Sequence, residues 1–159
     1  MTFDDAYVDH FVSVFPVLAE RGIQGCFFPA AKSIIKNEVL DVNQIHHVMA
    51  SLNDDEVLFE KICMLLKKYR NEYGLESNEY YYTKLNKEKK YLDTVKIAYI
   101  KALLQYELPR VVSKLILDEL FAKYVSSDLE GFAKELYMNK EQLRCMMKNG
   151  MVVGNHGYD

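Results

Sequence analysis

Apolar residues recur every three or four positions through the middle of the 159-residue chain, from Leu40 onward. This spacing is typical of helices that bury one face, so the middle of the chain is expected to be helical. The polar, tyrosine-rich stretch 77–90 is expected to be a loop or a short helix. Residues suited to begin or end the helices occur along this region: Asp41, Asn53 with Glu56 in capping-box spacing, Gly74, Asp93, Pro109, and Ser126 or Ser127.

The first 30 residues carry a different pattern. Residues 23–30 form a short apolar run between turn residues, which predicts a buried strand. Before this run, apolar residues from Phe11 to Leu18 recur at helical spacing, with Pro16 suited to the first turn of a short helix and Gly22 suited to follow its end. Only three residues precede the aspartates, so the first strand is nearly absent. Acidic loop, helix and strand in this order predict a βαβ unit.

The last 20 residues predict a helix followed by a strand. Asn139 and Gln142 have the spacing of a capping box at the start of this helix, and Gly150 is suited to stop it. The apolar run 151–153 then predicts a strand that would deliver Asn155 and His156 at its C-terminal end.

Composition excludes several classes of function. A net charge of −3 and a pI near 5.8 lack the basic excess of nucleic-acid-binding proteins. Three widely spaced cysteines favour reduced thiols over a disulfide framework or a structural zinc. No apolar run approaches the roughly 20 residues of a membrane span, and the first residues do not resemble a signal peptide. A cytoplasmic protein is therefore expected.

Candidate catalytic groups follow two of the apolar runs. Asp4 and Asp5 are adjacent, and alternation along a strand would point their carboxylates in different directions, one toward a metal and one toward the attacked substrate. His156 follows the last predicted strand, and open α/β sheets and barrels place active sites at such strand ends. A structural interpretation stays open for each motif, because aspartate is common at turns and helix caps and a lone histidine is commonly a structural hydrogen-bonding group.

Two groups of sequence features carry a resemblance to a known family. At the N-terminus they are Thr2-Phe3-Asp4-Asp5, Tyr7, Phe15-Pro16-Val17-Leu18, Arg21-Gly22-Ile23 and Cys26-Phe27-Phe28-Pro29. At the C-terminus they run from Gln142-Leu143 through Lys148-Asn149-Gly150-Met151-Val152-Val153-Gly154-Asn155-His156. The first group resembles the opening of a polysaccharide deacetylase (NodB-homology, carbohydrate esterase) domain, and the second resembles that family's second motif region. The helical middle of the chain lies outside the resemblance.

This resemblance implies an α/β fold, a distorted (β/α) barrel, that hydrolyses N- or O-acetyl groups of a polysaccharide or glycan with a divalent metal, most often zinc. By matching motifs, Asp4 would be the general base, and Asp5 and His156 would be metal ligands. Two histidines and a carboxylate leave an open position on zinc for water. The metal acidifies that water and polarises the carbonyl while a carboxylate takes the proton.

The resemblance also implies a partial domain. Residues 1–35 would be the first βαβ unit, residues 36–138 a helical insertion, and residues 139–159 the helix and strand leading to the second motif, so that the chain is mostly helical with two or three short parallel strands. Ala6 stands where the family has glycine, and Gly157 where it has serine or threonine. The family's second metal histidine and its later motifs are not in the sequence, so weak metal binding and no useful turnover are expected.

A second interpretation accepts the predicted helices but assigns the chain no catalytic function. The chain would then be a non-catalytic helical module that binds a partner protein through its amphipathic faces. For the first interpretation the expected partners are an acetylated glycan substrate and a second copy of the chain covering exposed barrel edges, with no nucleic acid and no membrane span. Convergence of Asp4, Asp5 and His156 would favour the first interpretation, and their separation would favour the second.

Overall fold

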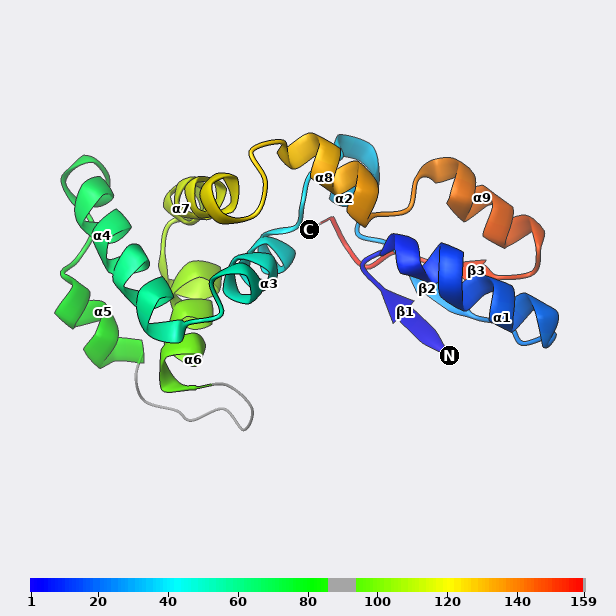
Figure 1. The fold of residues 1–159 in the computed structure, drawn as a ribbon, viewed down its shortest axis with the longest axis horizontal. Helices are drawn as coiled ribbons and strands as arrows, with labels where there is room; N and C mark the ends of the chain where they lie inside the picture. The colour runs from blue at the N-terminus through cyan, green and yellow to red at the C-terminus, as the bar shows by residue number, and fades with distance from the viewer. Residues whose placement is uncertain (86–93, 159) are drawn as a thin grey trace. The chain divides into compact units, whose positions relative to one another are not determined.

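Three short parallel strands join the two ends of the chain in a computed structural model that describes residues 1–85 and 94–158. The strands are β1 (Thr2–Asp4), β2 (Cys26–Phe28) and β3 (Val152–Val153), in the spatial order β1-β2-β3 (Figure 1). Phe3 pairs with Phe27, which pairs in turn with Val153. The predicted βαβ unit and the predicted final strand are therefore both present.

The chain divides into two compact units. Met1–Leu40 and Asp128–Asp159 form the first, which contains the strands and is called the sheet unit below. Asp41–Ser127 form the second, the helical unit. The helical unit spans fewer residues than the predicted insertion 36–138. The difference arises because Tyr137 and Met138 are almost fully buried and Met138 belongs to the core of the sheet unit.

The sheet unit buries one face of its sheet. Phe27 is fully buried in a core with Leu18, Met138 and Met146, and Phe3 packs against this core. The elements of the unit besides the strands are η1 (His10–Val14, a π-helical turn), α1 (Phe15–Glu20), α2 (Ala31–Lys36), α8 (Leu129–Leu136) and α9 (Lys140–Lys148).

The other face of the sheet is much less covered. Side chains alternate between the two faces of a strand, so Cys26 and Phe28 point away from the face that buries Phe27. Both are only partly buried, and Val152, paired with Cys26, is 42% exposed. Parallel sheets are normally covered on both faces. Within the described residues, this sheet is covered on one.

Helix ends in the sheet unit match their sequence signals. Pro16 lies in the first turn of α1, as predicted. After α1, Gly22 has a φ of +65°, and the N–H groups of Gly22 and Ile23 donate to the carbonyls of Ala19 and Leu18. This is the Schellman arrangement, in which a left-handed glycine lets the chain satisfy the last carbonyls of the helix. The capping box of Asn139 and Gln142 is also confirmed.

The helical unit consists of α3 (Asp41–Leu52), α4 (Asp55–Tyr73), α5 (Asn78–Leu85), α6 (Val95–Ala102), η2 (Leu103–Glu107, π-helical) and α7 (Arg110–Tyr124). Its core is formed by the apolar stripes that the sequence predicts, with Ile62, Leu66, Ile100, Ile116 and Phe121 fully buried. Gly74, with a φ of +62°, ends α4 as expected.

Several helix starts lie one or two residues from the predicted cap. Asp54, rather than Asn53, caps α4 by accepting hydrogen bonds from the N–H groups of Glu56 and Val57. Asn53 instead adopts a left-handed conformation with φ +47°, as asparagine does more readily than most residues. The predicted capping box at Asn53 and Glu56 is therefore wrong, because α4 begins one residue later and Asp54 accepts the hydrogen bonds at its start.

The remaining starts show the same kind of shift. Thr94 caps α6, and the predicted start at Asp93 lies outside the described residues. Asp128 caps α8 in place of Ser126 or Ser127. Pro109 precedes α7 as its N-cap instead of occupying its first turn. Stretch 77–90 is helical as far as Leu85, and the rest of it is not described.

The secondary structure is mostly helical with a small parallel sheet, as predicted. No described helix combines the length and the apolar character needed to cross a membrane.

Candidate functional site

Asp4, Asp5 and His156 lie together at the C-terminal end of the sheet. Nε2 of His156 is 3.7 Å from Oδ2 of Asp4, and its Nδ1 is 3.8 Å from Oδ1 of Asp5. These residues are about 150 positions apart in sequence. Parallel pairing brings them together, because it places the C-terminal ends of β1 and β3 on the same edge of the sheet.

Backbone hydrogen bonds hold each end of the cluster against β2. The N–H of Asp5 donates to the carbonyl of Phe28 at 3.0 Å, which extends the β1–β2 ladder one residue past the strand. The N–H of His156 donates to the carbonyl of Pro29, also at 3.0 Å. The main chain of Phe28 and Pro29, at the C-terminal end of β2, thus fixes the spacing between the acidic pair and the histidine.

A tight turn redirects the chain directly after Asp4. Asp5 and Ala6 both have left-handed conformations, with φ of +66° and +60°. Such a conformation costs a non-glycine residue about 1–2 kcal/mol, although aspartate tolerates it better than most. Ala6 is 1% exposed, so burial of its methyl group offsets part of this cost, roughly 0.8 kcal/mol. Its carbonyl accepts a hydrogen bond from the N–H of Met138 at 2.8 Å. Alanine is therefore accommodated where the resemblance expects glycine.

Two glycines shape the segment that carries His156. A Cβ at Gly154 would lie 2.6 Å from the ring of Phe28, so any larger residue would force the ring or the segment to shift. Gly157 has a φ of +103°, which disfavours the serine or threonine that the resemblance expects there. The carbonyls of Gly157 and Tyr158 accept hydrogen bonds from the N–H groups of Ala31 and Lys32 in the first turn of α2. These contacts secure the loop after His156 by main-chain bonds.

The cluster is open to water. The side chain of Asp4 is 58% exposed, that of His156 47%, and that of Asp5 23%. Charge interactions at such exposure are worth little to stability, about 0–1 kcal/mol for a typical surface pair. The clustering of the two carboxylates and the imidazole is therefore not explained by a contribution to the free energy of folding. Asp5, the most sheltered, is the best placed to keep a fixed geometry.

The described residues fit a metal site only in part. Two donors of a tetrahedral zinc ion are about 3.4 Å apart, from Zn–N and Zn–O bonds of about 2.1 Å. The distance from Nδ1 of His156 to Oδ1 of Asp5 is near this value. However, Asp4 faces the other nitrogen of the ring. Among the described residues no group of three His, Cys, Asp or Glu side chains is arranged to hold a metal ion.

His10 packs beside the cluster as an aromatic side chain. Its ring lies 5.4 Å from that of Phe3 and 5.8 Å from that of Tyr7. Burial lowers the pKa of His10, and the nearby carboxylates of Asp9, Asp5 and Asp4 oppose this effect. These contacts give His10 a packing role beside the cluster. Nδ1 of His10 is buried and has no hydrogen-bond partner within the part of the chain that the structure describes.

Tyr7 is a neighbour of the cluster to which the sequence assigns no role. Burial, followed by the charge of Asp5, raises the pKa of Tyr7 to about 12. Its ring stacks on that of Tyr137 at 5.9 Å, and the two residues form an antiparallel bridge. The phenol therefore stays neutral beside Asp5. The sequence signals for Tyr7 are its position two residues after Asp5 and its place among the residues that carry the resemblance, and neither assigns the phenol a role.

Comparisons with known proteins do not identify the chain. No protein-family model matches it, and neither the curated proteins nor the solved structures include a significant match.

Proposed function

We propose that the sheet unit carries the first part of a metal-dependent deacetylase site, as its resemblance to polysaccharide deacetylases suggests. The observation that carries this proposal is the meeting of Asp4, Asp5 and His156 within 3.8 Å at one end of a parallel sheet. The substrate class is an acetylated polysaccharide or glycan, and the reaction is hydrolysis of its N- or O-acetyl groups.

The half-covered sheet supports the same proposal. A barrel carries helices on the outside of its sheet and side chains on the inside, with the catalytic groups at the C-terminal strand ends. Phe27 lies on the face that packs against the core, while Phe28 lies on the face left partly open. Asp4, which pairs with Phe28, shares this open face at its C-terminal end. A barrel with zinc as its metal is the finer form of the proposal.

The roles follow from chemistry and from position. Asp5 and His156 would supply two ligands of a divalent metal, which would acidify water and polarise the acetyl carbonyl. Asp4, the more exposed carboxylate, would take the proton from the attacking water. Since a third protein ligand is not among the described residues, we expect weak zinc binding and no useful turnover by this chain alone.

Calorimetric titration with zinc tests the two ligands. We expect Asp5→Asn and His156→Gln each to weaken binding at least about tenfold, as loss of a ligand costs no less than loss of its supporting partner. Asparagine keeps the left-handed tolerance that position 5 requires. Glu20→Gln and His46→Gln are matched controls, since both residues are exposed and lie outside the cluster. Unchanged binding in both ligand variants would refute the proposed metal site.

Release of acetate from an acetylated oligosaccharide, measured with added zinc, tests the expected incompetence. Zinc-dependent turnover by the purified chain would contradict it and would require further catalytic groups that the cluster does not show.

The alternative, a helical interaction module, is favoured by one feature of the helical unit. A pocket of about 240 Å³ between α4 and α7 is lined by Met64, which is 57% exposed, and by the three lysines Lys61, Lys68 and Lys123. Glu119 also lines it and pairs with Lys68 at 2.6 Å, which leaves Lys61 and Lys123 as the lysines without that partner. Exposed methionine among cations suits a partner that combines apolar and acidic side chains. Binding of a labelled acidic amphipathic peptide, lost on Met64→Lys and kept in Asp5→Asn, would support this function.

A further inference from the structure

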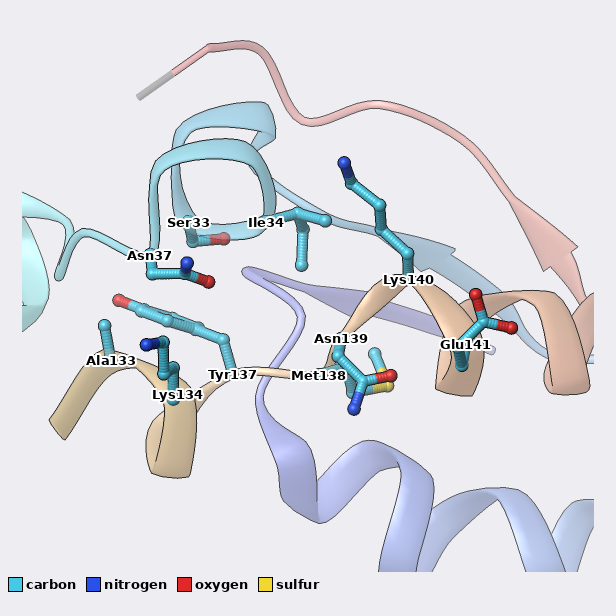
Figure 2. A pocket seen from close by; sticks show the side chains of 10 residues that line it. All are labelled: Ser33, Ile34, Asn37, Ala133, Lys134, Tyr137, Met138, Asn139, Lys140 and Glu141. Carbon is cyan, nitrogen blue, oxygen red and sulfur yellow. The ribbon is translucent and has the colours of Figure 1, made fainter. Parts of the chain in front are cut away.

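A pocket of about 480 Å³ lies in the sheet unit between α2 and the α8–α9 segment. Its volume falls within the range of small-molecule sites in proteins, about 300–1,000 Å³. Figure 2 shows its lining, which comes from residues 33–37 on one side and residues 133–141 on the other. Asp4, Asp5 and His156 do not line it, so it is separate from the candidate metal site.

The floor of the pocket is apolar and well ordered by packing. Tyr137, Met138 and Ala133 are each at most 3% exposed and form this floor, with Ile34 on the wall formed by α2. The ring of Tyr137 extends along the floor toward Asn37 (Figure 2), and its hydroxyl oxygen accepts a hydrogen bond from the N–H of Leu40 at 3.1 Å. A rigid apolar floor of this kind suits the hydrocarbon part of a ligand.

The rim of the pocket is cationic. Lys134 and Lys140 both line it and both are exposed. Lys134 pairs with Glu130 across one helical turn at 2.6 Å, and both side chains are more than half exposed, so a ligand can compete for this lysine. Within the described residues, Lys140 makes no ion pair that would neutralise it. The single acidic residue of the lining, Glu141, is engaged by Arg144.

We propose that this pocket binds a small organic anion, with an apolar body on the floor formed by Tyr137 and Met138 and a carboxylate or phosphate head at the rim that carries Lys134 and Lys140. Asn37, whose amide faces the pocket in Figure 2, offers a hydrogen bond to the same head group. The proposal is independent of the metal site, since the two share no residue.

Amide NMR titrations with phenylbutyrate, phenylbutanol and phenyl phosphate test this proposal on the full chain. Phenylbutyrate is expected to give saturable shifts at Asn37, Tyr137 and Met138. Phenylbutanol, which has the same body without the charge, should bind at least about fivefold more weakly, the difference expected from charge-assisted contacts. Phenyl phosphate distinguishes a preference for phosphate from a preference for carboxylate, and binding of either anion supports the site.

Variants locate the contribution of the lysines. The double change Lys134→Gln with Lys140→Gln should weaken phenylbutyrate binding at least about fivefold, while Lys148→Gln, an exposed lysine at the other end of α9, should leave it unchanged. All three lysines are exposed, so the fold is expected to tolerate these changes. Equal binding of phenylbutanol, unchanged binding by the double variant, shifts confined to other residues, or no saturable shifts with either anion at millimolar concentration would each overturn the proposal.

Discussion

The two units of the chain differ in how the sequence segments inside each unit are brought together. The helical unit is one continuous segment, Asp41–Ser127, in which the first helix, α3, packs chiefly on the last, α7. The sheet unit is built from both ends of the chain, and its β2–β3 ladder pairs Cys26 with Val152. Loop-closure entropy grows slowly, by about 0.6 kcal/mol for each doubling of loop length. A long helical segment between the strands therefore costs the sheet unit little stability, while the candidate chemistry stays entirely in the sheet unit.

Truncating one core aromatic ring in each unit is the strongest test of this comparison. Phe27 and Phe121 are both fully buried, so Phe27→Ala and Phe121→Ala should each cost about 3–5 kcal/mol in the free energy of unfolding of its own unit. Amide hydrogen exchange should then show lost protection in β2 for the first variant and in α7 for the second.

The outcome decides whether the units unfold separately. If Phe27→Ala lowers protection in α7 as much as in β2, the units unfold as one and the comparison fails. If each variant affects only its own unit, the helical unit is an autonomous folding element within the chain.

Removing one helix cap in each unit gives a smaller effect that sharpens the comparison. Asn139 caps α9 with both bonds of a capping box, and Asp54 caps α4 by accepting from two N–H groups. Asn139→Ala and Asp54→Ala should each cost about 1 kcal/mol, within a range of about 0.5–2. Asn53→Gly is the matched control for the second, since glycine suits the left-handed conformation of position 53 and should not destabilise α4.

Urea unfolding measures these costs. A loss for Asn53→Gly as large as that for Asp54→Ala would contradict the assignment of Asp54 as the cap of α4.

Local signals explain what could be predicted from the sequence. The capping box at Asn139, the glycine after α1 and the apolar stripes of α4 and α7 act over a few residues, and the structure reproduces them. The predicted N-cap was wrong where two residues suited to capping are adjacent, as at Asn53 and Asp54. Sequence spacing alone does not choose between them, because the choice depends on which residue takes the left-handed conformation.

The candidate site depends on contacts that no local signal contains. The resemblance named Asp4, Asp5 and His156, and the parallel sheet brings them together. The geometry of the imidazole between two carboxylates could not be predicted, since it results from the main-chain bonds of Asp5 and His156 to Phe28 and Pro29 at the end of β2. The pocket lined by Tyr137 and Lys140 was also missed, because α2 and α8 are about 100 residues apart and meet only in the fold.

The smallest expected effect concerns pH, and it again pairs one residue from each unit. Burial lowers the pKa of His10 in the sheet unit and of His47 in the helical unit. Each histidine takes up a proton more readily in the unfolded chain, near pH 6.5. Their contribution to stability is therefore present above about pH 6.5 and is lost as the pH falls through the lowered pKa of the folded state.

Replacing each ring with phenylalanine isolates this contribution. His10→Phe should reduce the loss of stability of the sheet unit on acidification, because the new ring keeps the contacts with Phe3 and Tyr7 and cannot bind a proton. His47→Phe should do the same for the helical unit, where the ring meets Phe121 edge-on. Exchange protection measured on both sides of about pH 6.5 checks each unit. The carboxylates near His10 oppose its shift, whereas His46 adds to that of His47. A variant that loses stability on acidification as steeply as the unaltered chain would contradict the role of the replaced ring.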